Sequence, residues 1–186
     1  WAGARTGLRG SWAGMFTAAR TPAMCELTFA AESFYNDGSM TAANETDAPD
    51  AANTHSDTDL REAALAWRAD DPDPETQAEV DRLLDAGDLA ALRDRFGSSL
   101  TFGTAGLRGL IGAGPNRMNR RVVLRTTAGF VAYLKEHVSG ADARGVVIGY
   151  DGRRGSRQFA EDAAAVICGA GVKAYVFEHV VPTPVA

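Results

Sequence analysis

Hydrophobic residues recur at steps of three and four between residues 59 and 97, and this spacing predicts three helices. The run 71–74 separates the first two helices, because Asp73 suits an N-cap and Pro74 the first helical position. A Gly-Asp pair at 87–88 marks the second break. The apolar faces expected for the three helices are Leu60, Ala63, Ala64 and Trp67, then Val80, Leu83 and Leu84, and last Leu89, Leu92 and Phe96.

Beyond residue 98 the pattern changes, and short apolar runs alternate with helical spacing. The run 145–150 is nearly continuous and rich in β-branched residues, which is typical of a strand covered on both faces. Further strands are expected at 173–178 and at 99–102, where the chain enters a glycine-rich segment.

Two longer helices are expected between these strands. Asn119 suits the N-cap of a helix through His137, and Ser156 suits the N-cap of the next. Strands alternating with helices predict an α/β fold, here a three-layer α/β/α domain with crossover connections. Ligands of such sheets bind at the strand ends, where Asp151-Gly152-Arg153 falls.

The chain divides into three parts by this pattern. Residues 1–39 open on Trp1 rather than Met and show no sustained periodicity, while residues 40–58 are polar. We therefore expect residues 1–58 to be a disordered tail or an upstream extension. Residues 59–97 are expected to form a helical prologue, and residues 98–186 an α/β domain.

The composition fits a globular protein with room for one ordinary domain plus tails. The chain has 186 residues, 45% of them hydrophobic, and no apolar run long enough to span a bilayer. Cys25 and Cys168 give no disulfide framework, and Cys168 is expected to be a buried reduced thiol. These features favour a reducing, cytoplasmic compartment and no membrane partner.

Charge is distributed unevenly along the chain. After residue 100 lie 11 of the 19 Lys and Arg residues but only 6 of the 24 Asp and Glu residues. A basic second half favours an anionic ligand. Nucleic acid is disfavoured as a partner, because the arginines are spread over several elements without interleaved aromatic residues. His55, His137 and His179 lack cysteine or carboxylate partners at metal-ligand spacing.

The segment 102–109 is the strongest candidate for chemistry. Gly103, Gly106 and Gly109 let backbone N–H groups approach a ligand closely, and Arg108 adds a fork of donors suited to phosphate oxygens. Thr104 adds a hydroxyl to the same turn. The alternative is a glycine-rich turn with a solvated arginine. The spacing matches neither a Walker A loop nor the Rossmann fingerprint, and Cys168 does not begin a Cys-x5-Arg phosphatase loop.

The run FGTAGLRGLIGAGPNRMN at 102–119 resembles the N-terminal motif of the α-D-phosphohexomutases, in particular the phosphoglucomutase-2-like and phosphomannomutase-like branch. The resemblance continues through the run 149–153, Ser156 and Phe159 to Pro-Thr-Pro at 182–184. It covers roughly residues 65–186 and implies that residues 98–186 are domain I of such an enzyme, truncated before its phosphoserine loop.

The resemblance also implies an activity. Phosphohexomutases move a phosphoryl group between C1 and C6 of a hexose phosphate, glucose or mannose, through an enzyme phosphoserine and a hexose 1,6-bisphosphate. They use Mg2+ held in an Asp-Gly-Asp loop. Phosphopentomutases of the same branch act on ribose phosphates. The partner implied is a phosphorylated sugar.

Site residues follow from the same resemblance, position by position. Arg108 matches a catalytic arginine, which would stabilise the charge of the transferring phosphoryl group. The phosphate-binding candidates are Thr104, Gly106, Arg108 and Arg117, and the candidates for support of the active site are Asn119, Asp151 and Arg153. For Asp151 and Arg153, pairing with each other or support of the phosphoserine loop is expected before substrate contact, and a single Asp151 makes no metal site.

The Thr-Ala-Ser-His-Asn-Pro motif of the nucleophile loop does not occur in the 186 residues, and neither does the Asp-Gly-Asp motif of the Mg2+ loop. We therefore expect the chain to be the N-terminal part of a phosphoglucomutase or phosphomannomutase type isomerase and to be inactive by itself. A non-catalytic α/β module that binds a phosphorylated ligand or a partner protein is the alternative, as is part of a phosphopentomutase.

Overall fold

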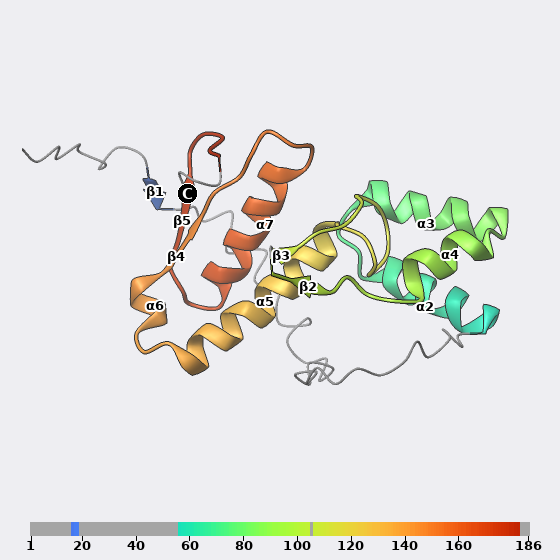
Figure 1. The fold of residues 1–186 in the computed structure, drawn as a ribbon, viewed down its shortest axis with the longest axis horizontal. Coiled ribbons are helices and arrows are strands. Elements are labelled where there is room, and N and C mark those ends of the chain that lie inside the picture. The colour runs from blue at the N-terminus through green and yellow to red at the C-terminus, as the bar shows by residue number, and fades with distance from the viewer. Residues whose placement is uncertain (1–15, 19–55, 105, 183–186) are drawn as a thin grey trace, which may run out of the picture.

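The computed structural model describes residues 16–18, 56–104 and 106–182, and Figure 1 shows them as a helical bundle and an α/β unit joined along one long helix. The order of elements begins with a short strand and the bundle helices. The α/β unit follows. The elements are β1 (Phe16–Ala18), α2 (Asp57–Ala69), α3 (Pro74–Ala86), α4 (Leu89–Phe96), β2 (Phe102–Gly103), β3 (Gly106–Leu107), α5 (Arg120–His137), α6 (Ala141–Arg144), β4 (Val146–Ile148), α7 (Ser156–Gly169) and β5 (Ala174–Phe177).

The three helices predicted between residues 59 and 97 are confirmed as α2, α3 and α4. Each begins at a side-chain cap, as sequence chemistry requires for the free N–H groups of a first turn. Ser56 caps α2 in a capping box with Asp59, Asp73 caps α3 ahead of Pro74, and Asp88 caps α4. Their apolar faces meet in one core of Leu60, Ala64, Trp67, Val80, Leu92 and Phe96, joined by Ala113 from the loop before α5.

The mixed α/β fold is confirmed beyond the bundle. Strands β4 and β5 are parallel neighbours connected through α7, and β1 pairs antiparallel with the other edge of β5. Strand β1 falls within residues 1–58, where the sequence suggests a tail or an extension. Helices α5 and α7 pack together over the sheet, around a core of Val131, Ala164, Ile167, Val172 and Ala174.

Several local expectations need correction. Strand β4 was expected to be covered on both faces, yet Val147 is 53% exposed, because among the described residues the helices pack on the face of Val146 and Ile148. The strand expected at 99–102 is found only at its last residue, because the first arm of the hairpin β2–β3 is Phe102–Gly103. Ser156 is the first residue of α7 rather than its cap, since Gly155 takes the cap position with φ 79°.

The bundle is held to the α/β unit by two arginines at the start of α5. Arg121 lies over the ring of Trp67 at 5.6 Å, donates to the carbonyl oxygen of Trp67 and pairs with Asp70. Arg120 donates to both carboxylate oxygens of Asp162 on α7, each at 2.8 Å, and at 3.4 Å to the carbonyl oxygen of Pro72. These contacts place the bundle beside the segment that leads from the glycine-rich hairpin into α5.

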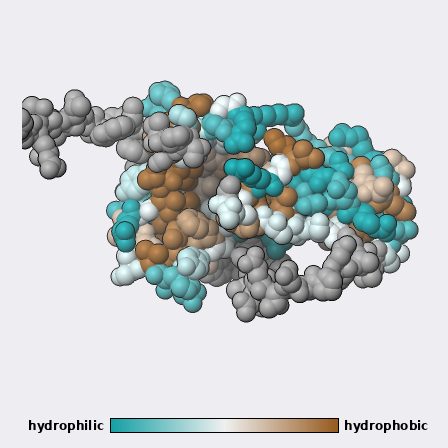
Figure 2. Space-filling view, viewed as in Figure 1, coloured by the Kyte–Doolittle hydropathy of each residue, from teal (hydrophilic) through white to brown (hydrophobic). Residues whose placement is uncertain are grey.

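Hydrophobic and hydrophilic surface are separated in the view of Figure 2, where brown residues gather over the α/β unit and teal residues cover much of the bundle. Phe130, Tyr133 and Val147 are among the exposed hydrophobic residues of the α/β unit. Among the described residues, no helix combines the length and the apolar character that crossing a membrane would require.

Candidate functional site

The glycine-rich segment forms a two-stranded hairpin. Phe102 pairs with Leu107 and Gly103 with Gly106, so the chain reverses its direction between Gly103 and Gly106. Gly106 has φ 86°, a left-handed conformation that residues with a Cβ adopt at a cost. The tight reversal therefore depends on glycine, and it leaves Thr104 exposed at the tip.

Arg108 directly follows strand β3. Its side chain is exposed, and it makes no hydrogen bond or ion pair with another described residue. Two large apolar side chains beside it are also exposed, Phe102 at 72% and Leu110 at 73%. An uncommitted guanidinium on a glycine-rich turn is available to an anion, which is the arrangement that the sequence predicts for phosphate contact.

The loop 110–119, which follows the hairpin, is closed on itself. The Met118 amide donates to the carbonyl oxygen of Leu110 at 2.8 Å, and the Gly112 amide donates to that of Met118 at 3.2 Å. The Asn119 side chain lies inside the loop at 2% exposure, where its amide nitrogen approaches three backbone carbonyl oxygens, those of Gly112 at 2.9 Å, Gly114 at 2.8 Å and Arg117 at 3.2 Å.

Asn119 also caps α5, as predicted, since its side-chain oxygen accepts from the amide of Val122 at 2.9 Å. Both ends of one carboxamide are therefore used, the oxygen for the helix and the nitrogen for the loop. The side chain fixes how the loop enters α5. This supports the expected role of Asn119 in positioning, while contact with a substrate stays a prediction.

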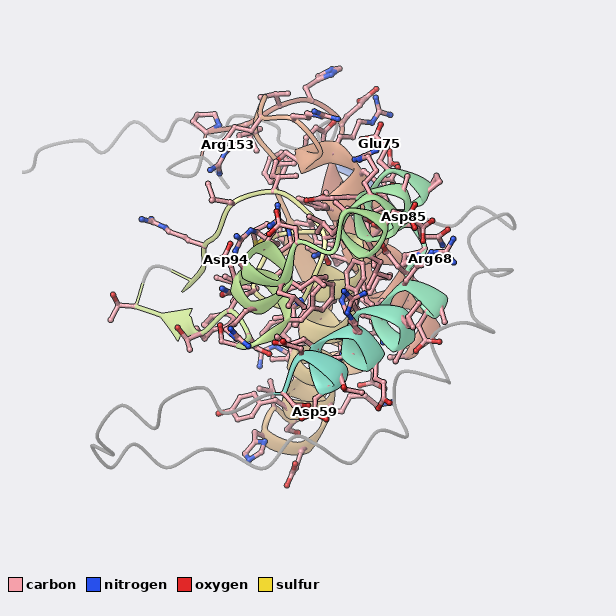
Figure 3. All side chains as sticks on the ribbon, turned by 90° about the vertical axis from the view of Figure 1, so that its right-hand side faces the viewer. Asp59, Arg68, Glu75, Asp85, Asp94 and Arg153 are labelled. Carbon is pink, nitrogen blue, oxygen red and sulfur yellow. The ribbon has the colours of Figure 1, made fainter. Side chains whose placement is uncertain are left out.

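Arg117 is engaged by the bundle. It is 9% exposed, pairs with Asp94 at the end of α4, and donates at 2.8 Å to the carbonyl oxygen of Asn116. Figure 3 shows Asp94 on the side of the bundle that the hairpin occupies. Contact between Arg117 and a phosphate would require exchange of this carboxylate partner, so the observed geometry favours a structural role.

Asp151 and Arg153 lie in a second group, beyond the carboxyl end of β4. The two side chains pair, as expected, with Arg153 Nε donating to Asp151 Oδ2 at 2.7 Å. The pKa of Asp151 lies below its usual range, mainly because its carboxylate accepts a hydrogen bond from the backbone amide of Arg153. Burial partly opposes this shift. The backbone amide of Asp151 donates to the hydroxyl oxygen of Ser156 at 3.3 Å.

This second group borders an open cavity of about 790 Å³ at the ends of β4 and β5. Its lining contains side chains of both charges and residues of the N-terminal part of α7. It consists of Tyr150, Asp151, Gly152, Arg153, Gly155, Arg157, Gln158, Glu161, Glu178, His179 and Val180.

The predicted residues thus fall into separate places. Thr104, Gly106 and Arg108 lie on the hairpin, Arg117 and Asn119 in the loop that follows, and Asp151 with Arg153 at the cavity. The cavity is not lined by any residue of the hairpin. Within the described ranges no group of three or more His, Cys, Asp or Glu side chains could hold a metal ion, so Mg2+ finds no fitting site among them.

Three residues that position this region were missed by sequence reasoning, Glu79, Asp94 and Arg95. All lie in the helical prologue, to which the sequence assigns no chemistry. Glu79 Oε2 accepts from the amide of Ala113 at 2.9 Å, 34 positions along the chain. Neither periodicity nor motif spacing signals such a contact, because it joins a helix surface to a loop folded back on it.

Comparison with known proteins gives one matching family domain. Residues 99–186 match the domain described as phosphoglucomutase/phosphomannomutase, alpha/beta/alpha domain I. That range contains the hairpin, the loop and the cavity.

Curated relatives extend the similarity toward the bundle. The chain is 39% identical to the phosphopentomutase of Mus musculus in an alignment of 146 positions that covers 75% of this chain and 24% of that protein. It is 43% identical to the probable phosphoribomutase of Schizosaccharomyces pombe over 125 residues, 67% of this chain and 21% of that protein. It is 38% identical to the glucose 1,6-bisphosphate synthase of Homo sapiens in an alignment of 134 positions that covers 69% of this chain and 22% of that protein.

The chain spans less than a quarter of the length of these relatives. No solved structure matches it.

Proposed function

We propose that the chain is part of a phosphosugar mutase, because residues 99–186 match domain I of the phosphoglucomutase/phosphomannomutase family. The proposed reaction moves a phosphoryl group between the anomeric hydroxyl and the terminal hydroxyl of a sugar phosphate. The observation that carries the proposal is the exposed Arg108 beside a glycine-dependent turn within the matched domain.

Arg108 is the proposed catalytic residue of this chain. A transferring phosphoryl group spreads negative charge over three equatorial oxygens, and enzymes lower the barrier mainly by positioning and by stabilising that charge. A planar guanidinium donates two parallel hydrogen bonds to such oxygens. Arg108 has its donors free for this among the described residues.

Thr104 and Gly106 are proposed to bind the same phosphate, the first through its hydroxyl and the second through its backbone amide. Both lie within four residues of Arg108 in the same glycine-rich segment, which is why all three are proposed for one phosphate. Arg117, Asn119, Asp151 and Arg153 are proposed to support the site. The contacts of Arg117 and Asn119 favour a role in holding the loop.

Several parts of the proposed reaction lie outside the described residues. The phosphoserine implied by the resemblance is one, and the ligands of Mg2+ are another. Bound Mg2+ would supply charge neutralisation of phosphate oxygens. A sugar 1,6-bisphosphate or its pentose equivalent is proposed as the activator, and a cytoplasmic location as the setting.

Pentose phosphates are the substrates proposed first. The relatives named phosphopentomutase and phosphoribomutase support this choice at 39% and 43% identity. The relative named glucose 1,6-bisphosphate synthase, at 38% identity, makes glucose phosphates the second choice. Mannose phosphates, expected from the phosphomannomutase-like resemblance, come third.

The test is an assay of the full-length protein with ribose 1-phosphate, glucose 1-phosphate and mannose 1-phosphate, each with Mg2+ and the matching sugar bisphosphate. The proposal predicts turnover to the isomeric phosphate, with the highest kcat/KM for ribose 1-phosphate. Higher kcat/KM for a hexose phosphate would reverse the substrate order alone. No turnover of any substrate would contradict the mutase proposal and favour a non-catalytic binding module.

A further inference from the structure

The helical prologue contacts the loop 110–119, which connects the glycine-rich hairpin to α5. Glu79 of α3 lies at the centre of this contact. One carboxylate oxygen accepts from the amide of Ala113 at 2.9 Å, and the other accepts from Arg95 Nε at 3.1 Å and pairs with a terminal nitrogen of Arg95 at 3.0 Å. The side chains of Glu79 and Arg95 are only 23% and 22% exposed, so the pair is well shielded from solvent.

Helix α4 also binds this loop, through two of its backbone carbonyl oxygens. The carbonyl oxygen of Arg95 accepts from the amide of Asn116 at 3.1 Å, and that of Asp94 accepts from the Asn116 side chain at 2.8 Å. Gly114 approaches so closely that a Cβ there would lie 2.7 Å from the carbonyl oxygen of Arg95. No residue larger than glycine fits this contact without displacing backbone.

Ala113 is buried in the prologue core itself. It is 0% exposed and belongs to the same cluster as Leu60, Trp67, Val80 and Leu92. The loop is therefore held by apolar packing as well as by hydrogen bonds. A neutral amide bonded to a paired, shielded carboxylate makes a stronger hydrogen bond than one to an uncharged acceptor.

A displacement of this loop would reach Arg108. The loop closes at Leu110 through the Met118 amide, and only Gly109 separates Leu110 from Arg108. Gly109 packs against Leu100, whose amide donates to the carbonyl oxygen of Pro115 at 3.0 Å, so both arms of the hairpin are tied to the loop. A displacement of the loop therefore displaces the backbone from which the Arg108 side chain extends.

We propose that Glu79 is a positioning residue, which anchors the loop 110–119 on the prologue and through it sets the place of Arg108. This inference rests on the proposed function of Arg108. It assigns the prologue a part in catalysis, although its residues need not touch substrate. Misplacement of a catalytic group by about 1 Å can lower a rate by roughly 100-fold, which makes such an anchor consequential.

Asp81 provides a matched control. It lies on the same helix as Glu79 and pairs with Arg68 of α2, with Arg68 donating to Asp81 Oδ2 at 2.7 Å. Figure 3 shows Arg68 on the opposite side of the bundle from Asp94 and the hairpin. Asp81→Ala therefore removes an interhelical ion pair from α3 without touching the loop.

The first experiment measures kcat and KM of the full-length Glu79→Ala and Asp81→Ala variants below their melting temperatures. Glu79→Ala should lower kcat by about 10- to 100-fold with a smaller change in KM, since Arg108 acts in the transition state. Asp81→Ala should keep the wild-type kcat. Glu79→Gln, which keeps an oxygen for the Ala113 amide, should lose less than Glu79→Ala and serves where the alanine variant fails to fold.

A double-mutant cycle then tests whether Glu79 acts through Arg108. In an Arg108→Ala background, Glu79→Ala should change kcat by no more than about twofold. A wild-type kcat in both Glu79 variants would overturn the inference and leave the mutase proposal standing. Equal decreases of kcat in the Glu79 and Asp81 variants, or full additivity of Glu79→Ala with Arg108→Ala, would also overturn the inference and leave the mutase proposal standing.

Hydrogen exchange separates this inference from the proposed function. The amides of Ala113, Asn116 and Met118 should exchange faster in Glu79→Ala than in Asp81→Ala, because each belongs to the anchored loop. If the wild-type protein turns over no sugar phosphate, the mutase proposal fails. The exchange rates of these amides then decide whether Glu79 anchors the loop. Equal exchange in the two variants would overturn it.

Discussion

The Asn119 side chain fixes both the start of α5 and the loop that precedes it. Its oxygen caps α5 while its nitrogen serves carbonyl oxygens of the loop 110–119. A carboxylate of the same shape keeps the acceptor but supplies no donor. The sequence predicts that Asn119 caps α5, because Asn before a helical pattern is an N-cap signal. It does not predict that the side-chain nitrogen also binds the loop.

Asn119→Asp should destabilise the protein by roughly 2–4 kcal/mol, since it leaves buried carbonyl oxygens without a donor and sets a negative charge among them. Urea unfolding measures the loss. Asp73→Asn is the mirror control at the exposed cap of α3, where Asp and Asn cap about equally well and the change should stay within about 0.5 kcal/mol. Equal effects at both caps would show that the loop does not depend on the Asn119 amide.

Asp71 is the buried acid whose pH response is most informative. It is 3% exposed between α2 and α3, and burial raises its pKa above the usual range although the Thr76 hydroxyl hydrogen-bonds to it and opposes the shift. A carboxyl whose pKa is raised by folding contributes stability below its unfolded pKa. That contribution is lost as pH rises through the folded pKa.

The stability of the wild type relative to Asp71→Asn should therefore fall as pH rises from about 3 to 6, the range around an ordinary Asp pKa of about 3.9. Asp151, whose pKa is lowered, should show the opposite trend: the stability of the wild type relative to Asp151→Asn should fall as the pH drops below the ordinary Asp pKa of about 3.9. Urea titrations at several pH values test both. A relative stability that rises with pH at Asp71 would contradict the assignment.

At the scale of elements, helices α5 and α7 are joined by a charge pair inside the fold. Arg120 donates twice to Asp162, which is 4% exposed and also accepts from the Gln158 side chain at 3.1 Å. The hydrogen bonds with Asp162 raise the pKa of Arg120. Neither residue is a candidate for chemistry, so the pair serves helix packing.

Asp162→Ala should cost about 3–5 kcal/mol, because it leaves a partly buried guanidinium without its partner. The double variant Arg120→Met/Asp162→Leu should cost less than Asp162→Ala alone, since no unpaired charge remains. Glu161→Ala, at an exposed i,i+4 pair on the same helix, should stay within about 0.5 kcal/mol. Additive losses in the double variant would show that the two side chains do not interact.

The sequence predicts elements well where local chemistry decides them. Helices α2, α3 and α4 have caps and apolar faces that need no tertiary context, and strand β5 follows its apolar run. The hairpin β2–β3 was expected as a single strand, because its reversal depends on the conformation of Gly106. Helix α6 went unpredicted, since four residues carry no periodicity.

At the scale of the whole molecule, the structure has two cores joined by a loop. One core lies in the bundle and takes in Ala113, and the other lies between α5, α7 and the sheet. The sequence separates the prologue from the α/β domain, and that division remains our proposal. It does not reveal that the prologue holds the loop next to Arg108, because the hydrogen bonds between prologue and loop join residues more than 20 positions apart.

Arg108 is proposed to stabilise a transferring phosphoryl group. The most direct measurement is kcat of full-length Arg108→Ala with the preferred sugar phosphate, beside Arg144→Ala as a control at an exposed arginine of α6. Loss of one such electrostatic donor lowers kcat by about 100- to 1,000-fold, and Arg108→Ala should do so with an unchanged melting temperature. Wild-type turnover in Arg108→Ala, or an equal loss in Arg144→Ala, would contradict the claim.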